Sequence, residues 1–222
     1  MSETIITVHG SARSELRPER AIVRFTVAAD GPERASVVAS VTDASTAIAA
    51  VIDARFDAQA GPVTAWSADR VAVTSHRPWT NDGSTAPLIH RASVSGQATV
   101  SEVDEVSGLI GALVEHDLVA IDGIEWALTD ARLELETREA RTRAVADARA
   151  KAEVLATAIG LGSLTTLALA DPGMLDGGTE HPAPLPRLER AMAMDARGDG
   201  GLSLRPEPIV IDVAVDARFS AR

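Results

Sequence analysis

Hydrophobic and polar residues alternate near the start of the chain, in the segment TIITVHGSARSEL (residues 4–16). Small and apolar residues fall on one face of this segment: Ile6, Val8, Gly10 and Ala12. Alternation of this kind predicts a strand with one buried face. A second alternating segment, ERAIVRFTVAADG (residues 19–31), follows Pro18, which breaks the first. The two segments are therefore predicted to form an antiparallel pair joined around residues 16–19.

Five later segments also carry strand patterns. Residues 63–79 alternate but slip near 67–69, which predicts one strand with a bend or bulge. A turn signal at Asp82-Gly83 separates them from residues 88–100, the most regular alternation in the chain. The remaining strand segments are 118–130, 163–171 and 208–219. The last is so well patterned that we expect it to pair inside a sheet.

Three segments place apolar residues at helical spacing. The first covers residues 33–57. The second is expected to begin with a capping box made by Ser101 and Asp104 and to run through Val114. The third is expected to be capped by Asp130 and to end at Gly160, because glycine suits the left-handed residue that follows a helix.

The third helix has no reactive side chain but a clear packing pattern. Alanines recur every four residues along it: Ala140, Ala144, Ala148 and Ala152. Alanine has the highest helix propensity, and a row of small residues lets a neighbouring backbone lie close. Two pairs, Glu139–Arg143 and Asp147–Lys151, have the favourable i,i+4 order. We interpret this helix as a structural strut.

This order of elements predicts an α+β fold, with an antiparallel-rich β-sheet and two to three long helices packed on one face. One domain is expected to cover residues 1–222. Residues 172–205 are rich in proline, glycine and charge, which predicts a long mobile loop before the last strand.

Composition narrows the possible partners. Hydrophobic residues make up 45% of the 222, so the chain can bury a core, although only 3% are aromatic. The net charge of −11 argues against nucleic acid as the main partner, since phosphates are bound by clustered positive charge, and against anionic lipid. There is no cysteine, which excludes disulfide and thiol chemistry. Lys151 is the only lysine among 21 basic residues.

The N-terminal segment, MSETIITVHGS, has no basic start and no apolar run of signal-peptide length. No run of apolar residues approaches the roughly 18 that a membrane span needs. The chain is therefore expected to be soluble and cytoplasmic, with no membrane span.

Two histidines are weak candidates for a metal site. If the hairpin of residues 63–100 is symmetric about Gly83, then His76 and His90 face each other across its strands. Two imidazoles can begin a zinc or nickel site, but a third ligand is usually needed, and Asp69 and Asp82 are only guesses. Two exposed polar strand residues are the simpler interpretation. No metal or other cofactor is therefore assigned.

Large aromatic residues are the other candidates. Trp79 follows Pro78 in a predicted loop and is the best candidate for an interface; a side chain folded back on its own sheet is the alternative. Trp66 and Trp126 can equally fill the core. Motifs that could suggest other activities have simpler explanations: an Arg-Gly-Asp triplet at 197–199 by chance, and the glutamates of 134–139 as a solvated helix face. No serine lies in a nucleophile elbow.

Four segments, in this order, carry a resemblance to a known family: ITVHGSARSELRPERAIVRFTVAADGP, HRASVSGQATVSEVDEVSGLIGALVEHD, RTRAVADARAKAEVLATAIGLG and PRLERAMAMDA. Together they make the chain resemble the SIMPL-domain family over nearly its whole length. His90 stands where tyrosine is frequent in the family. Members include bacterial periplasmic immunogenic proteins, oxidative-stress-defence proteins and a eukaryotic kinase adaptor. Many bacterial members carry a signal peptide.

The resemblance implies homo-oligomers and unidentified protein partners, with a possible link to stress defence, and it supplies no catalytic motif. A non-enzymatic, self-assembling protein is therefore the favoured hypothesis. A small-molecule or metal-binding module is the alternative, and a hydrolase ranks last because no nucleophile with a base is evident.

Overall fold

The computed structural model describes residues 3–79, 85–175 and 204–222. Their contacts group into two compact units. Unit 1 contains the described residues of Met1–Arg17, Leu128–Met192 and Pro208–Arg222, and unit 2 contains those of Pro18–Ala127 and Ala193–Glu207. Each unit has its own sheet, whereas the hydrophobic pattern predicted a single sheet. Of the mobile loop expected over 172–205, residues 176–203 lie outside the described part.

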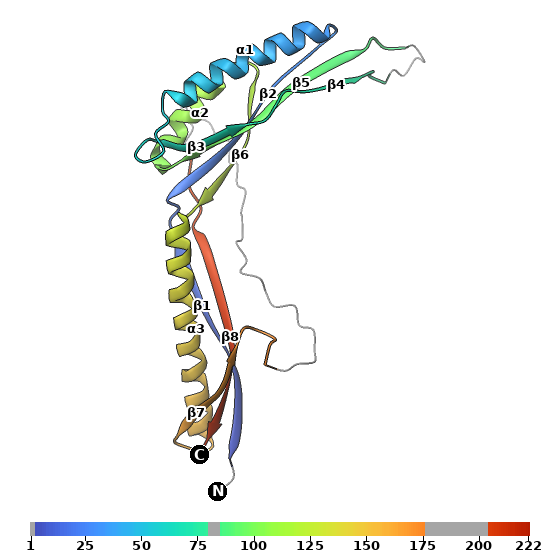
Figure 1. The fold of residues 1–222 in the computed structure, drawn as a ribbon. Coiled ribbons are helices and arrows are strands. Elements are labelled where there is room, and N and C mark those ends of the chain that lie inside the picture. Colours follow the sequence, from blue (N-terminus) through green and yellow to red (C-terminus); the bar gives the residue numbers. More distant parts are fainter. Residues whose placement is uncertain (1–2, 80–84, 176–203) are drawn as a thin grey trace. The chain divides into compact units, whose positions relative to one another are not determined.

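Unit 1 is a three-stranded antiparallel sheet covered by one long helix (Figure 1). The strands lie in the order β1 (Thr4–Leu16), β8 (Ile209–Ala221) and β7 (Leu164–Ala170). The helix α3 (Asp130–Ala158) packs against β1 and β8. The expected pairing of the last strand inside a sheet is confirmed, because β8 lies between the other two.

The partner of β1 differs from the prediction. β1 pairs with β8 along its whole length, from Thr4 opposite Ala221 to Leu16 opposite Ile209, and not with the strand that follows it. This register places apolar residues opposite each other, for example Ile6 opposite Phe219. The alternation in β1 identified its buried face correctly, but alternation does not specify which strand lies beside it.

The core of unit 1 is built from small residues on the helix and larger ones on the sheet. The alanine row is confirmed as the buried face of α3. Its fully buried members are Ala140, Ala144, Ala148 and Ala152. Phe219 and Val215 of β8 and Ile6 of β1 pack against this row. Leu155 and Ile159, near the end of this helix, are about half exposed and lie outside the buried row.

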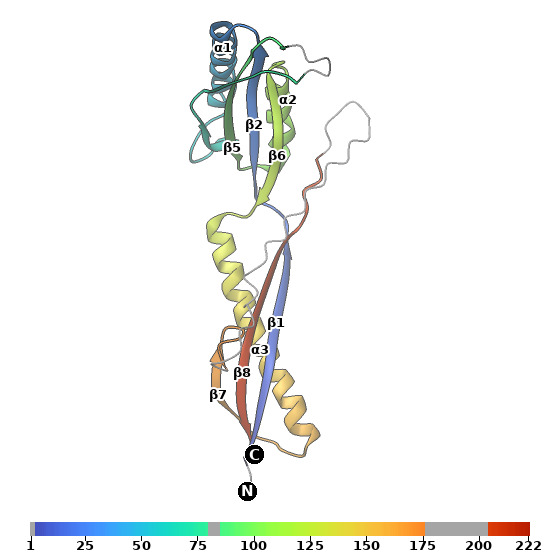
Figure 2. The same ribbon diagram turned by 90° about the vertical axis from the view of Figure 1, so that its right-hand side faces the viewer.

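Unit 2 is built around β2 (Arg20–Gly31), which pairs with β5 (Ile89–Val100) on one side and with β6 (Val119–Ala127) on the other (Figure 2). On its other side, β5 pairs with two shorter strands, β3 (Val63–Ala68) and β4 (Ala72–His76). The single bent strand predicted over 63–79 is therefore two strands, interrupted where the slip in alternation was noted.

Two helices cover the core of unit 2, α1 (Arg34–Asp53) and α2 (Val106–Val114). They contact each other and β2. A short 3₁₀ turn, η1 (Val103–Glu105), precedes α2. Phe25 of β2 is fully buried, and it packs among branched residues from both helices. These residues are Val37, Val41, Ile48, Ile52, Leu109, Ile110 and Leu113. With unit 1, this arrangement confirms the α+β class and its antiparallel pairing.

Two predicted helix caps are wrong. The hydroxyl of Ser101 donates to the carbonyl of Gly61 (2.9 Å) instead of capping α2. The side chain of Thr129, not Asp130, accepts a hydrogen bond from the backbone N–H of Arg132 and caps α3. Gly160 has a φ of 79°, which confirms the predicted left-handed residue after α3.

By length and composition alone, α1 could cross a membrane. A membrane span was not predicted here, because the valines and alanines of α1 are interspersed with serine and threonine and form no continuous apolar run. The core helices of soluble proteins meet the same test, and the buried residues of α1 pack into unit 2. A single helix of this kind is weak evidence for a membrane span.

Candidate functional site

The two candidate metal ligands do not come together. In the hairpin of β4 and β5, His90 lies opposite Ser75, and His76 lies opposite Ile89. The ring Nδ1 of His90 is 2.7 Å from the hydroxyl of Ser75. Because successive residues of a strand point to opposite faces, His76 and His90 lie on different faces of the sheet.

The observed register of β4 and β5 differs by one residue from that of a hairpin symmetric about Gly83. The burial of apolar side chains explains the difference. Val73 lies opposite Ala92, and both contact the core of unit 2. A one-residue shift would place Val73 opposite Ser93, on the polar face. Of the guessed further ligands, Asp69 donates its backbone N–H to Ser95, and Asp82 lies outside the described residues. Within 3–79, 85–175 and 204–222, no three metal-binding side chains form a group.

The three tryptophans fall into two classes. Trp66 and Trp126 are partly buried against the core of unit 2, and the indole N–H of Trp66 donates to Asp53 (3.0 Å). Trp79, just beyond β4, is 84% exposed. The alternative of a ring folded back on its own sheet therefore does not describe Trp79. An exposed tryptophan is a large apolar surface that a partner can cover.

A polar cluster in unit 1 contacts the middle of the outer edge of β1. The carboxylate of Asp147 on α3 accepts a hydrogen bond from the backbone N–H of Ser11 (2.8 Å). The ammonium group of Lys151, one turn later, donates to the backbone carbonyl of His9 (3.0 Å) and lies 2.6 Å from Asp147. These two side chains bond one carbonyl and one N–H of β1, the groups that an added strand would use.

The Asp147–Lys151 pair was predicted from its spacing, but its contact with β1 was missed. The one signal in the sequence was that Lys151 is the only lysine. The pKa of Asp147 is lowered, first by the hydrogen bond from Lys151 and then by that from the Ser11 N–H. Both causes favour the charged carboxylate, so Asp147 stays ionised at neutral pH.

His9 also takes part in this cluster through its side chain. Its Nδ1 lies 2.7 Å from Asp216 on β8, and the other oxygen of Asp216 accepts from the backbone N–H of Gly173 (2.7 Å). Partial burial opposes ionisation of Asp216, but the His9 and Gly173 hydrogen bonds outweigh it and lower the pKa. These contacts tie the turn after β7 to β8.

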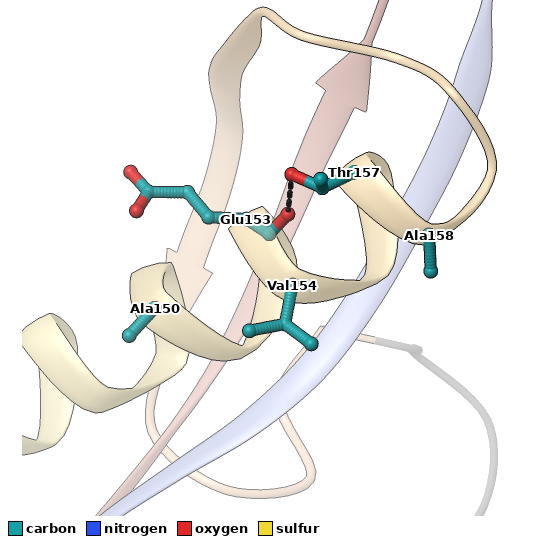
Figure 3. Close-up of a pocket in the computed structure, with 5 residues that line it drawn as sticks. All are labelled: Ala150, Glu153, Val154, Thr157 and Ala158. Atoms are coloured by element: carbon teal, nitrogen blue, oxygen red, sulfur yellow. Dashed lines mark hydrogen bonds between the residues drawn. The ribbon is translucent and has the colours of Figure 1, made fainter.

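The solvent side of α3 has a shallow, open depression (Figure 3). Ala150, Val154 and Ala158 line it at four-residue spacing, opposite the buried alanines, with Glu153 and Thr157 beside them. The hydroxyl of Thr157 bonds back to the carbonyl of Glu153 (2.8 Å). All five residues belong to one helix, so the depression is an open part of the surface and not an enclosed pocket for a small substrate.

The buried Glu136 departs from the expectation of a solvated acidic face. Its side chain is 9% exposed and lies 2.8 Å from Arg132, one turn earlier. Glu134 is exposed and pairs with Arg138 (2.8 Å). Glu134 and Glu136 therefore each pair with an arginine one turn away on α3, and such pairs stabilise a helix.

Comparison with known proteins identifies a family. A family model described as SIMPL, protein of unknown function (DUF541), matches residues 6–219. No curated protein matches the chain. The match covers both units.

Proposed function

Because this chain belongs to the SIMPL family, whose description is a protein of unknown function, we propose that it acts without catalysis, by assembling with its own copies and contacting other proteins. The observation that carries the proposal is Trp79, which is 84% exposed in a chain with only three tryptophans. Covering such a ring removes a large apolar area from water, and tryptophan is enriched among residues that dominate binding energies.

The backbone immediately before Trp79 is restrained, which favours binding. Pro78 fixes one dihedral angle immediately before it. The guanidinium of Arg77 donates to the carbonyl of Ala86 (2.9 Å), and this contact joins the two sides of the hairpin. A side chain presented from a restrained segment loses less conformational entropy on binding than one on a free loop.

Self-association of the chain is expected to depend on ionic strength. Each chain carries −11, so copies repel one another at low ionic strength. Salt screens this repulsion over about 8 Å at physiological concentration, whereas apolar contacts are not weakened. Assembly is therefore expected to increase with added salt, in contrast to a complex held by ion pairs.

A link to stress defence is part of the proposal and rests on the family resemblance. The absence of cysteine means that such a role would proceed through protein contacts and not through thiol oxidation. Cells lacking the gene should be more sensitive to peroxide. Complementation by the wild-type chain but not by Trp79→Ser would support the link, and unchanged sensitivity would remove it.

The central test is the mass of the native protein. Light scattering and native mass spectrometry at micromolar concentration should give multiples of 23.2 kDa. Trp79→Ser should raise the dissociation constant about tenfold or more, as expected for a dominant interface residue. Phe56→Ser is the matched control, because Phe56 is a 43% exposed aromatic residue of the same unit. A strict monomer, or equal effects of both substitutions, would refute the proposal.

A further inference from the structure

We draw no further inference here: the strongest candidate, the half-open pocket of unit 2 lined by residues 29–33 and by Ser36, Val37 and Ser40 in the first turns of α1, carries none, because it rests on the N-terminus of α1 alone and, in the described part of the chain, no buried polar side chain without a hydrogen-bond partner lines it.

Discussion

Gly10 of β1 lies against Ala148 of α3 so closely that a Cβ atom on Gly10 would be 2.7 Å from the Cβ of Ala148. It would lie even closer to the carbonyl oxygen of Ala144. Real Cβ atoms do not approach other atoms this closely, so only glycine fits. The close approach of helix and strand also brings Asp147 and Lys151 within hydrogen-bonding distance of the β1 backbone.

Gly10→Ala is therefore expected to destabilise unit 1. The added methyl group meets backbone atoms, which cannot move aside as the end of a flexible side chain can. Overpacking of this kind costs about 1–3 kcal/mol or more. Urea denaturation followed by circular dichroism would measure the loss in the free energy of unfolding.

The control for Gly10→Ala is Gly111→Ala in α2, where nothing lies within 4 Å of the added atom. Alanine is favoured over glycine inside a helix by about 0.5–1 kcal/mol. Gly111→Ala should therefore raise the stability. A Gly10→Ala variant as stable as the wild type would contradict the packing described for β1 and α3.

Removing the charge of Lys151 should expose the edge of β1. Lys151→Met keeps the length of the side chain but cannot donate to the carbonyl of His9. Aggregation on heating should increase and the midpoint of unfolding should fall, because an open edge can pair with other chains. The matched control is Arg149→Met, which breaks an exposed ion pair with Glu153 on the same helix. Equal aggregation of the two variants would show that the edge contact is unimportant.

Acid should weaken unit 1 partly through Asp147. Its pKa in the folded protein is lowered by Lys151 and by the Ser11 N–H, so the folded state binds this proton less readily than the unfolded chain. The resulting stabilisation is complete above the ordinary pKa of about 3.9 and is lost as the pH falls through the lower folded value. The wild-type melting temperature should therefore drop more steeply below about pH 4 than that of Asp147→Asn.

Glu134→Gln is the control for this acid experiment, because Glu134 and its partner Arg138 are both exposed on α3. Its melting temperature should follow the wild-type curve, since exposed ion pairs contribute at most about 1 kcal/mol. Identical curves for the wild type and Asp147→Asn would contradict a stabilising role of the Asp147 contacts.

The spacing of apolar residues predicted most helices and strands of this fold, because this spacing reflects which face of each element is buried. The alternation in β1 marked Ile6 as buried, and the four-residue spacing marked Ala144 and Ala148. The same spacing did not predict which strands pair with each other. β1 and β2 are adjacent in sequence, yet β1 joins β8. Both strands have an apolar face, and which faces meet is decided by packing across about 200 residues, which no local window contains.

Polar contacts were the least predictable feature of the candidate sites. Ser101 and Asp130 both fit capping patterns, but a hydroxyl bonds whichever acceptor the tertiary fold brings near, and for Ser101 that acceptor is Gly61. The spacing of Asp147 and Lys151 predicted their ion pair. Their contact with the β1 edge depends on the approach allowed by Gly10, which lies more than 130 residues earlier.

The register of the β4–β5 hairpin differs by one residue from the predicted one, and this difference gives a last prediction. Ser75, not His76, lies opposite His90, and the Ser75 hydroxyl is 2.7 Å from its ring. Ser75→His should therefore place two imidazoles side by side on one face, where they can share a zinc or nickel ion. Calorimetry should show binding about tenfold tighter or more than that of the wild type.

The same register predicts that His76 takes no part in this engineered site, because it lies on the opposite face with Ile89. Adding His76→Ala to the Ser75→His variant should leave the affinity for zinc unchanged, whereas adding His90→Ala should abolish the gain. If His76→Ala weakened zinc binding by the wild-type chain, the two native histidines would have to share a face. The apolar pair of Val73 and Ala92 would then not set the register.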